Sequence, residues 1–250
     1  MHPLENSWAV DAMIRSYNHV HNAAFNARYE DLGGVGVSYY GKQPNAPVKM
    51  EFLAFDPDPV VVTAKVNSYP KKTDDKFVLT TFHDEPIDTS KPQYTALGYE
   101  FVETAMLMGL PLPVKLSRGW THVFKIDSLD EIEFANQGLS LGGEKIPPEV
   151  HGDPHILNFY AQLEHRAVGW AQLVTISEGI GYVNQVYTLP VYRQRGIGTR
   201  LLRRVHQEAN HLGLKHMVLL ASQMGMTLFR RAGYTPLAYL SLFRPREETA

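Results

Sequence analysis

The sequence predicts a mixed α/β protein in which a mostly antiparallel sheet is flanked by helices. Apolar and polar residues alternate along residues 157–189, and the apolar positions then repeat at helical spacing from Ile197 onward. Glycine and proline clusters separate the segments. A length of 250 residues suits one or two domains. We therefore expect a smaller N-terminal α/β domain at residues 1–117 and a second domain at residues 118–250.

The N-terminal half is expected to open with a helix and to continue as short strands. Residues 8–29 carry apolar side chains three and four positions apart, and Ser7 precedes them as a candidate N-cap. Turn-rich segments then bound a series of apolar runs, which predict strands at residues 35–40, 48–55, 60–66, 76–82 and 99–108. Pro111, Pro113 and the stretch at residues 117–121 mark the expected domain boundary.

The C-terminal half has a more regular pattern. A strand is expected at residues 121–126, and Ser128 with Glu131 forms a capping box that predicts a helix. Residues 137–156 are rich in glycine and proline and predict a long loop that could cover a site. The elements expected after it are strands at 157–163, 168–176 and 182–189, a helix from 197 to 212, a strand at 215–221, a helix at 224–232 and a strand at 237–243. The order is β-β-β-α-β-α-β.

Composition excludes several classes of function. Lys and Arg number 24 and Asp and Glu 26, a formal net charge of −2, which disfavours nucleic acid and anionic membranes as partners. The chain has no cysteine, so disulfides, thiolate metal sites and a cysteine nucleophile are excluded. No apolar run is long enough to span a bilayer and the N-terminus does not resemble a signal peptide. The expectation is a cytoplasmic protein.

The stretch at residues 190–200 contains the residues that indicate a binding function. It joins a strand to a helix, and Gly196 and Gly198 leave the first helical amides without side chains over them. Free amides at a helix N-terminus bind anions, because they and the helix dipole favour negative charge. Five arginines fall within twelve residues here: Arg193, Arg195, Arg200, Arg203 and Arg204. The combination predicts a diphosphate site.

Two alternatives compete with a diphosphate site. The simplest is a helix start with a solvated basic face. A nucleotide-binding dehydrogenase would need a third glycine where Leu201 stands, and an acidic residue about 20 positions further on. No Asp or Glu lies between Glu208 and Glu247, so the dehydrogenase interpretation fails. A complete phosphate loop is absent as well, because Gln43 stands after Gly41-Lys42 where that motif requires Ser or Thr.

Arg193-x-x-Gly196-x-Gly198 resembles the pyrophosphate-binding signature of the GNAT superfamily of acyl-CoA N-acyltransferases. Residues 221–234 resemble a second signature of that family, and residues 168–170 resemble its third-strand pattern. The resemblance is strongest over about residues 155–245 and begins at about residue 121. It implies a sheet that splays after its fourth strand. It also implies transfer of an acyl group, expected to be acetyl, from acyl-CoA to a primary amine by direct attack in a ternary complex.

The resemblance also implies roles for individual residues, with acetyl-CoA or another acyl-CoA as co-substrate and no metal. Main-chain groups at the fourth-strand end would hold the pantetheine arm and polarise the thioester carbonyl. The amides of the following turn would hold the pyrophosphate, steadied by arginines. The cofactor-binding residues implied are Tyr187, Thr188, Leu189, Arg193, Gln194, Arg195, Gly196, Ile197, Gly198, Thr199, Arg200, Ser222 and Phe229.

The catalytic residues are where this sequence departs from the family. Phe229 stands where members often carry a tyrosine that protonates the leaving thiolate, so Ser222 or a water would replace it. Many members carry a glutamate on the fourth strand, at a position near Tyr182, and Asn184 shares that face. Glu164, His165 and Glu178 are other candidate bases. These departures keep two alternatives open, a non-catalytic acyl-CoA sensor or scaffold and a transferase of the same fold with an unusual donor such as an aminoacyl-tRNA.

Histidines of the predicted loop and of the first predicted helix are candidate metal ligands. His151, Asp153 and His155 lie close together in the sequence, but a Gly/Pro loop does not hold ligands on one fixed face. A polar loop is the main interpretation, with an acceptor-side base or a metal as alternatives. His19 and His21 are two positions apart on a helix and therefore face different ways.

The N-terminal half carries a faint copy of the C-terminal one. Leu97-Gly98-Tyr99 parallels Ala232-Gly233-Tyr234, and each triplet leads into an apolar run. This similarity predicts a tandem protein with a degenerate GNAT-like first half. That half lacks the arginine–glycine signature and is not expected to bind a second CoA. The expected partner is a small-molecule or peptide amine, with no membrane partner, and the oligomeric state is left open.

Overall fold

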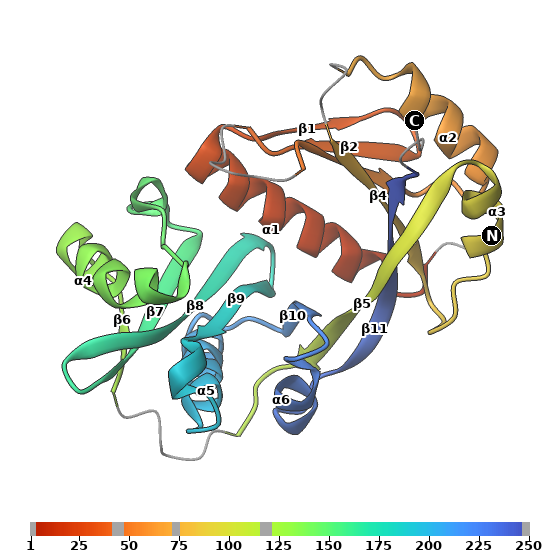
Figure 1. The fold of residues 1–250 in the computed structure, drawn as a ribbon. Helices are drawn as coiled ribbons and strands as arrows, with labels where there is room; N and C mark the ends of the chain where they lie inside the picture. The colour runs from red at the N-terminus through yellow and green to blue at the C-terminus, as the bar shows by residue number, and fades with distance from the viewer. Residues whose placement is uncertain (1–3, 42–47, 72–75, 116–121, 247–250) are drawn as a thin grey trace. The chain divides into compact units, whose positions relative to one another are not determined.

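The computed structural model describes residues 4–41, 48–71, 76–115 and 122–246 (Figure 1). The chain divides into two compact units. Unit 1 comprises Met1–Val10, His21–Leu107 and Pro236–Ala250, and unit 2 comprises Asp11–Val20 and Met108–Thr235. The domain boundary predicted between residues 117 and 118 lies outside the described residues. Among the described helices, none has the length and apolar character needed to cross a bilayer.

Unit 1 is built on a mixed sheet. Its elements, counting those that continue into unit 2, are α1 (Ser7–Phe25), β1 (Arg28–Asp31), β2 (Val35–Tyr39), β3 (Met50–Ala54), α2 (Pro59–Ser68), β4 (Phe77–His83), α3 (Lys91–Ala96), β5 (Tyr99–Pro111) and β11 (Thr235–Pro245). Strands β1, β2 and β3 pair antiparallel, β3 and β4 pair parallel, and β4 pairs antiparallel with β11. Phe52, Leu79 and Phe243 are fully buried in the core of this unit.

Two predictions for unit 1 are wrong. Residues 60–66 form helix α2 rather than a strand, because the Asp58 side chain accepts a hydrogen bond from Val60 N and Pro59 occupies the first turn. The buried residues of α2 recur at helical spacing, which the run of β-branched residues obscured in the sequence: Pro59, Val62, Thr63 and Val66. Ser7 is not the N-cap of α1. Asn6 holds that position, and its side chain makes no cap bond but donates to Leu237 O at 2.8 Å.

Unit 2 carries the element order predicted from residue 157 onward. Its elements are β6 (Val123–Lys125), α4 (Leu129–Leu139), η1 (Ser140–Gly142), η2 (Pro148–Val150), β7 (Ile156–Leu163), β8 (Arg166–Ser177), β9 (Ile180–Thr188), η3 (Pro190–Tyr192), α5 (Ile197–His211), β10 (His216–Ala221) and α6 (Met226–Arg231), with β11 following. Strands β6 to β9 pair antiparallel in sequence order, and β9 pairs parallel with β10. The predicted mixed, mostly antiparallel sheet with flanking helices is confirmed.

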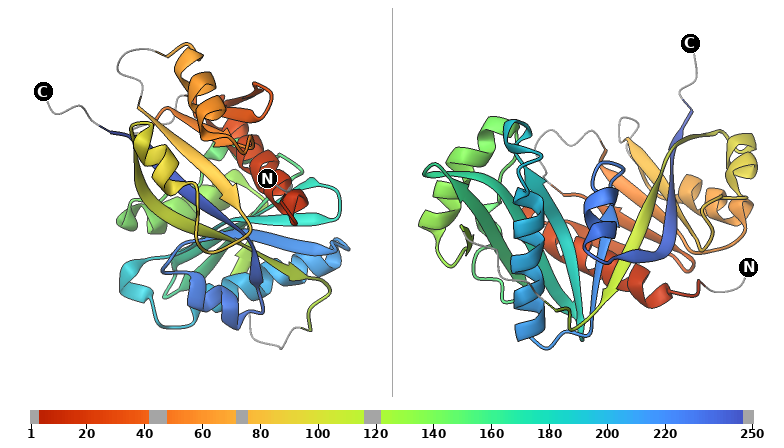
Figure 2. Two further views of the ribbon diagram at one scale, coloured as in Figure 1. Left: turned by 90° about the vertical axis from the view of Figure 1, so that its right-hand side faces the viewer. Right: turned by 90° about the horizontal axis from the view of Figure 1, so that it is seen from below.

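Helices α4 and α5 cover opposite faces of the unit 2 sheet. Helix α5 packs on β7, β8 and β9 (Figure 2), and Gly169 of β8 lies against Ile197 and Leu201. Helix α4 contacts the other face, where Phe134 packs edge-on against Tyr160, the register partner of Trp170. Because side chains alternate along a strand, residues of β8 two apart from Trp170 share the α4 face. The capping box of α4 is confirmed, since Ser128 Oγ accepts from Glu131 N at 3.2 Å.

The chain repeats one order of elements. The first series is β1-β2-β3-α2-β4-α3-β5, and the second is β7-β8-β9-α5-β10-α6-β11, whose last strand belongs to unit 1 apart from Thr235. The third and fourth strands of each series pair parallel, and the two strands before them pair antiparallel. Gly98 and Gly233 stand at the same place in each series, with φ values of 90° and 96°. This correspondence supports the tandem arrangement that the paired triplets predict.

A buried histidine links unit 2 stability to pH. His206 is 4% exposed, and its Nε2 lies 2.9 Å from the hydroxyl of the fully buried Tyr234. Burial lowers the pKa of His206 from 6.5 to about 4 and raises the pKa of Tyr234. The unfolded chain therefore takes up this proton first as the pH falls.

We expect stability to be full above pH 6.5 and to fall as the pH drops through 6.5 toward 4. The contribution of His206 lost by pH 5 is about 2 kcal/mol. Thermal unfolding of the wild type and of His206→Gln, measured from pH 8 to pH 4.5, should show a shallower pH dependence in the variant. Parallel curves would contradict this role for His206.

Candidate functional site

The sheet of unit 2 opens beside β9. Strand β9 pairs with β8 as far as Thr188, but it pairs with β10 only from Ile180 to Val183. In the register with β8, Gln172 faces Gln185 and Leu173 faces Val183. Asn184 is therefore the extra residue of a β-bulge. Among the described residues, no strand pairs with the remainder of β9 on its other side, as expected for a sheet splayed after this strand.

Main-chain groups along the open edge of β9 alternate in direction. The amide of Leu189 donates to Val168 O at 2.9 Å, and the carbonyl of Leu189 accepts from Tyr192 N at 2.9 Å. The amide and the carbonyl of Leu189 are thus engaged within the protein, and its pantetheine contact stays a prediction. Alternation then turns the main chain of Tyr187 toward β8 and that of Thr188 and Val186 toward the open edge.

Several consecutive backbone amides in the turn after β9 donate no hydrogen bond within the described chain. Gln194 and Gly196 have positive φ values of 63° and 73°, and Gly196 is the N-cap of α5. Within the described chain, no acceptor takes a hydrogen bond from the amides of residues 194–199, and the first helical bond joins Arg200 N to Gly196 O at 3.1 Å. Ile197, 3% exposed, anchors the helix start in the core. Free donors of this kind at a helix N-terminus favour negative charge.

Three arginines surround this turn and one is committed elsewhere. The Arg193 Nε donates to Thr188 O at 3.2 Å, and the Arg200 Nη2 donates to Arg195 O at 2.9 Å. The exposed Arg195 guanidinium lies 5.3 Å from the ring of Tyr192. Arg204 instead pairs with Glu208 at 2.7 Å, and its guanidinium lies over the ring of Phe159. The basic cluster seen in the sequence therefore divides into arginines beside the turn and Arg204, which is paired with Glu208.

The segment leading into α6 lies against the turn. A side chain at Gly198 would come within 3.0 Å of Leu228, and Arg193 Nη1 lies 3.5 Å from Met224 Sδ. Ser222 Oγ accepts from Gly225 N at 3.2 Å and is exposed, whereas Phe229 is 7% exposed and packs against Tyr234. Structure therefore brings Ser222 near the predicted cofactor residues and places Phe229 largely in the core.

A chain of amide side chains crosses the α4 face. Gln172 Nε2 donates to Asn158 Oδ1 at 2.9 Å, and Asn184 Nδ2 donates to Gln172 Oε1 at 2.8 Å. Tyr182, 4% exposed, is paired in register with Val174 and shares this face. The two residues predicted to take the place of a strand glutamate, Tyr182 and Asn184, thus lie on one face, and Asn184 is held by Gln172.

Glu144 is a functional candidate that the sequence did not reveal. Its backbone is tied to the end of α4, because Glu144 N donates to Leu139 O at 3.3 Å. Its carboxylate Oε2 lies 3.5 Å from Gln185 Nε2, beside the bulge of β9, and burial raises the pKa of Glu144. The only sequence signal was the long loop predicted at residues 137–156, and no spacing rule indicated that this residue would reach β9.

The other predicted candidates lie away from the splay. Glu164 and His165 form a tight turn with φ values of 51° and 60° and are exposed, and Glu178 is exposed in the next turn. His19 Nε2 lies 2.8 Å from Asp153 Oδ2, and the ring of His155 packs edge-on against His19. Among the residues with described positions, no group of three or more side chains is arranged to hold a metal ion.

Comparisons with known proteins agree with this geometry. Residues 120–234 match the model of the acetyltransferase (GNAT) family. A GCN5-related N-acetyltransferase from Kribbella flavida is similar in structure, with a TM-score of 0.67 and 17% identity over 95% of each chain. A GCN5-related N-acetyltransferase from Sphaerobacter thermophilus has a TM-score of 0.55 and 17% identity over 86% of this chain and 81% of its own.

A third solved structure has a tandem arrangement. It is a tandem GNAT protein from the clavulanic acid biosynthesis pathway, with a TM-score of 0.60 and 11% identity over 93% of this chain and 88% of its own. Comparison with curated proteins finds no sequence match. The family match, the repeated element order and the splayed strand agree, and residues 120–234 of this chain form a GNAT-family domain.

Proposed function

We propose that unit 2 is an N-acyltransferase that moves an acyl group, with acetyl as the expected case, from acyl-CoA to a primary amine. One observation carries the proposal: the uncommitted amides of residues 194–199 lie at the end of a strand whose edge is open. The amides and the guanidinium of Arg195 would bind the diphosphate. The amide of Thr188 and the main-chain groups of Val186 would pair with the pantetheine arm as an added strand, while the Thr188 carbonyl accepts a hydrogen bond from Arg193.

The chemistry requires a neutral amine and a leaving thiolate. The amine nitrogen attacks the thioester carbonyl, the new C–N bond forms, and the C–S bond breaks to release CoA as a thiolate. We propose Glu144 as the base that takes the ammonium proton, because a carboxylate with a raised pKa suits that task. Tyr182 and Asn184 would line the acceptor face, and the second N–H proton, which the attacking nitrogen loses on becoming an amide, would pass through Ser222 or a water to the thiolate.

The test is acceptor-dependent release of CoA. The full chain is incubated with acetyl-CoA and a panel of spermidine, kanamycin, lysine and a short peptide, and free thiol is followed with a chromogenic reagent. We expect release above background with at least one amine. If acetyl-CoA binds but no amine in the panel accelerates release, the alternative favoured by Phe229 prevails, namely a non-catalytic acyl-CoA sensor.

A further inference from the structure

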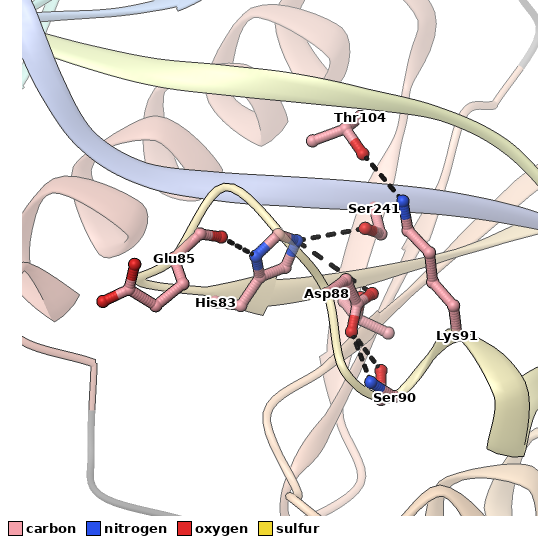
Figure 3. Close-up of polar contacts among 8 residues, drawn as sticks. His83, Glu85, Asp88, Ser90, Lys91, Thr104 and Ser241 are labelled. Carbon is pink, nitrogen blue, oxygen red and sulfur yellow. Dashed lines mark hydrogen bonds and ion pairs between the residues drawn. The ribbon is translucent and has the colours of Figure 1, made fainter.

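Unit 1 contains a cavity of about 260 Å³ that the proposed function does not use. Its walls come from the carboxyl ends of the parallel strands β3 and β4, from the loops that follow them, and from Tyr94 of α3. Ligands of α/β proteins commonly bind at the carboxyl ends of parallel strands. Figure 3 shows the polar residues at the end of β4 beside this cavity.

The bend from β3 into α2 corresponds in element order to the turn between β9 and α5 of unit 2, for which we propose phosphate binding. The bend carries acidic residues where that turn carries arginines and glycines. It reads Asp56, Pro57, Asp58 and Pro59, so two positions have no amide hydrogen. Asp58 N donates to Asp56 Oδ1 at 3.0 Å, and Val60 N donates to Asp58 Oδ1 at 2.8 Å. Acidic side chains thus occupy the amide donors that an anion would need, and this bend repels a diphosphate.

The cavity wall carries more acidic than basic side chains, and the histidine that lines it, His83, lies 4.0 Å from Asp88. Four carboxylates line it, and no lysine or arginine does; the four are Asp56, Asp84, Glu85 and Asp88. Lys91, close by in the sequence, turns away: its Nζ lies 3.4 Å from Thr104 Oγ1 and 3.6 Å from the ring centre of Phe101 (Figure 3). An anionic ligand would therefore meet net repulsion.

A hydrogen-bond network holds the wall at β4 in one shape. Asp88 Oδ1 accepts from Ser90 N at 2.8 Å and from Ser90 Oγ at 2.6 Å. Burial would raise the pKa of Asp88, but the bonds from Ser90 and Ser241 and the nearby His83 keep it below its usual value. His83 lies between Glu85 O at 2.5 Å and Ser241 Oγ at 3.0 Å (Figure 3). Asp88 is thus a fixed negative charge.

Apolar and aromatic side chains form another part of the wall, to which Tyr94 adds a hydroxyl group. The ring of Phe55, 40% exposed, stacks on Phe82 with centroids 5.3 Å apart, and Ile87 is 76% exposed. Tyr94 is only 2% exposed, and its hydroxyl has no hydrogen-bond partner among the described residues. The Tyr94 hydroxyl can therefore exchange a hydrogen bond with a ligand that enters the cavity.

We propose that this cavity is a binding site for a small organic cation, an ammonium group attached to an apolar or aromatic body. Asp84 and Glu85 would attract and hydrogen-bond the ammonium group, and Tyr94 Oη would accept a further bond from it. The stacked rings of Phe55 and Phe82 would contact the apolar body, and a cation over a ring face adds to the attraction. Unit 1 would thus hold an amine where unit 2 holds an acyl-CoA phosphate.

The test compares ligands that differ only in charge. Calorimetry on the full chain measures binding of 2-phenylethylammonium, the neutral 2-phenylethanol and the anion phenylacetate. We expect the cation to bind at least tenfold more tightly than either of the others. Equal binding of the neutral or anionic compound, or no binding of the cation at millimolar concentration, would overturn the proposal.

Variants locate the site and separate it from the acyltransferase. Asp84→Asn combined with Glu85→Gln should weaken binding of 2-phenylethylammonium about tenfold or more, because charge-assisted hydrogen bonds are lost. Glu133→Gln, an exposed carboxylate of unit 2, is the matched control and should change nothing. If binding is lost instead in Glu144→Gln and kept in the double variant, the amine occupies unit 2 and the cavity proposal is wrong. Acetyl-CoA binding, measured in parallel, reports separately on the proposed function.

Discussion

Replacing Gly198 with valine is expected to weaken acetyl-CoA binding by about 1–3 kcal/mol, a loss of roughly one to two orders of magnitude in affinity. A Cβ at this position would lie 3.0 Å from Leu228 Cδ2, so the end of the Leu228 side chain must give way by a few tenths of an ångström. The valine methyl groups would also stand in the approach to the amides of residues 194–199, on which the proposed diphosphate contact depends. Calorimetric titration with acetyl-CoA measures the change directly.

Arg195→Glu checks the same contact without crowding the turn. Arg195 is exposed, so the charge reversal should leave folding intact while weakening acetyl-CoA binding by about 1–3 kcal/mol. Arg166→Glu, an exposed arginine at the start of β8, is the matched control and should bind normally. Alanine at His151 or His155 should also leave the affinity unchanged. An unaltered dissociation constant in both turn variants would reject the assignment of this turn.

Glu144→Gln is expected to lower kcat by about 10²- to 10³-fold, the range typical of removing a general base. The amide keeps the shape of the side chain and its approach to Gln185 but cannot take a proton. Glu149→Gln, on the exposed surface of the same loop, should retain wild-type turnover. Acetyl-CoA binding should be the same in all three proteins, since the phosphate turn is untouched.

The pH profile separates a base from a merely structural residue. Burial raises the pKa of Glu144, so its basic form is lost as the pH falls through a value above the ordinary range for glutamate. The wild-type rate should fall on the acidic side of that raised pKa, and Glu144→Gln should lack this limb. A variant that keeps the limb, or keeps wild-type kcat, would remove Glu144 from the mechanism.

Local patterns predicted much of unit 2. The helix from Ile197, the capping box at Ser128 and the three-strand meander all express periodicities of a few residues, which short stretches of chain impose on themselves. In unit 1 the same reasoning failed at α2, because the run of valines favoured a strand while Asp58 and Pro59 set a helix start. Asp58 and Pro59 form a recognisable helix-start signal, but the same residue types are also typical of turns.

Long-range pairing decided the rest. The strand at the C-terminus was expected from its apolar run, yet its pairing with β4 of unit 1 depends on burial contributed by many residues far apart in the chain. The approach of Glu144 to Gln185 is of the same kind, as is the engagement of the Leu189 main chain by Val168.

The sequence by itself determined the turn at residues 190–200 that we propose to bind phosphate, because glycines and arginines act within a dozen residues through local backbone freedom and charge. Only the tertiary structure decided which carboxylate reaches β9 and what lines the cavity of unit 1. Those arrangements join segments through packing and desolvation, whose strength depends on neighbours that no local pattern specifies.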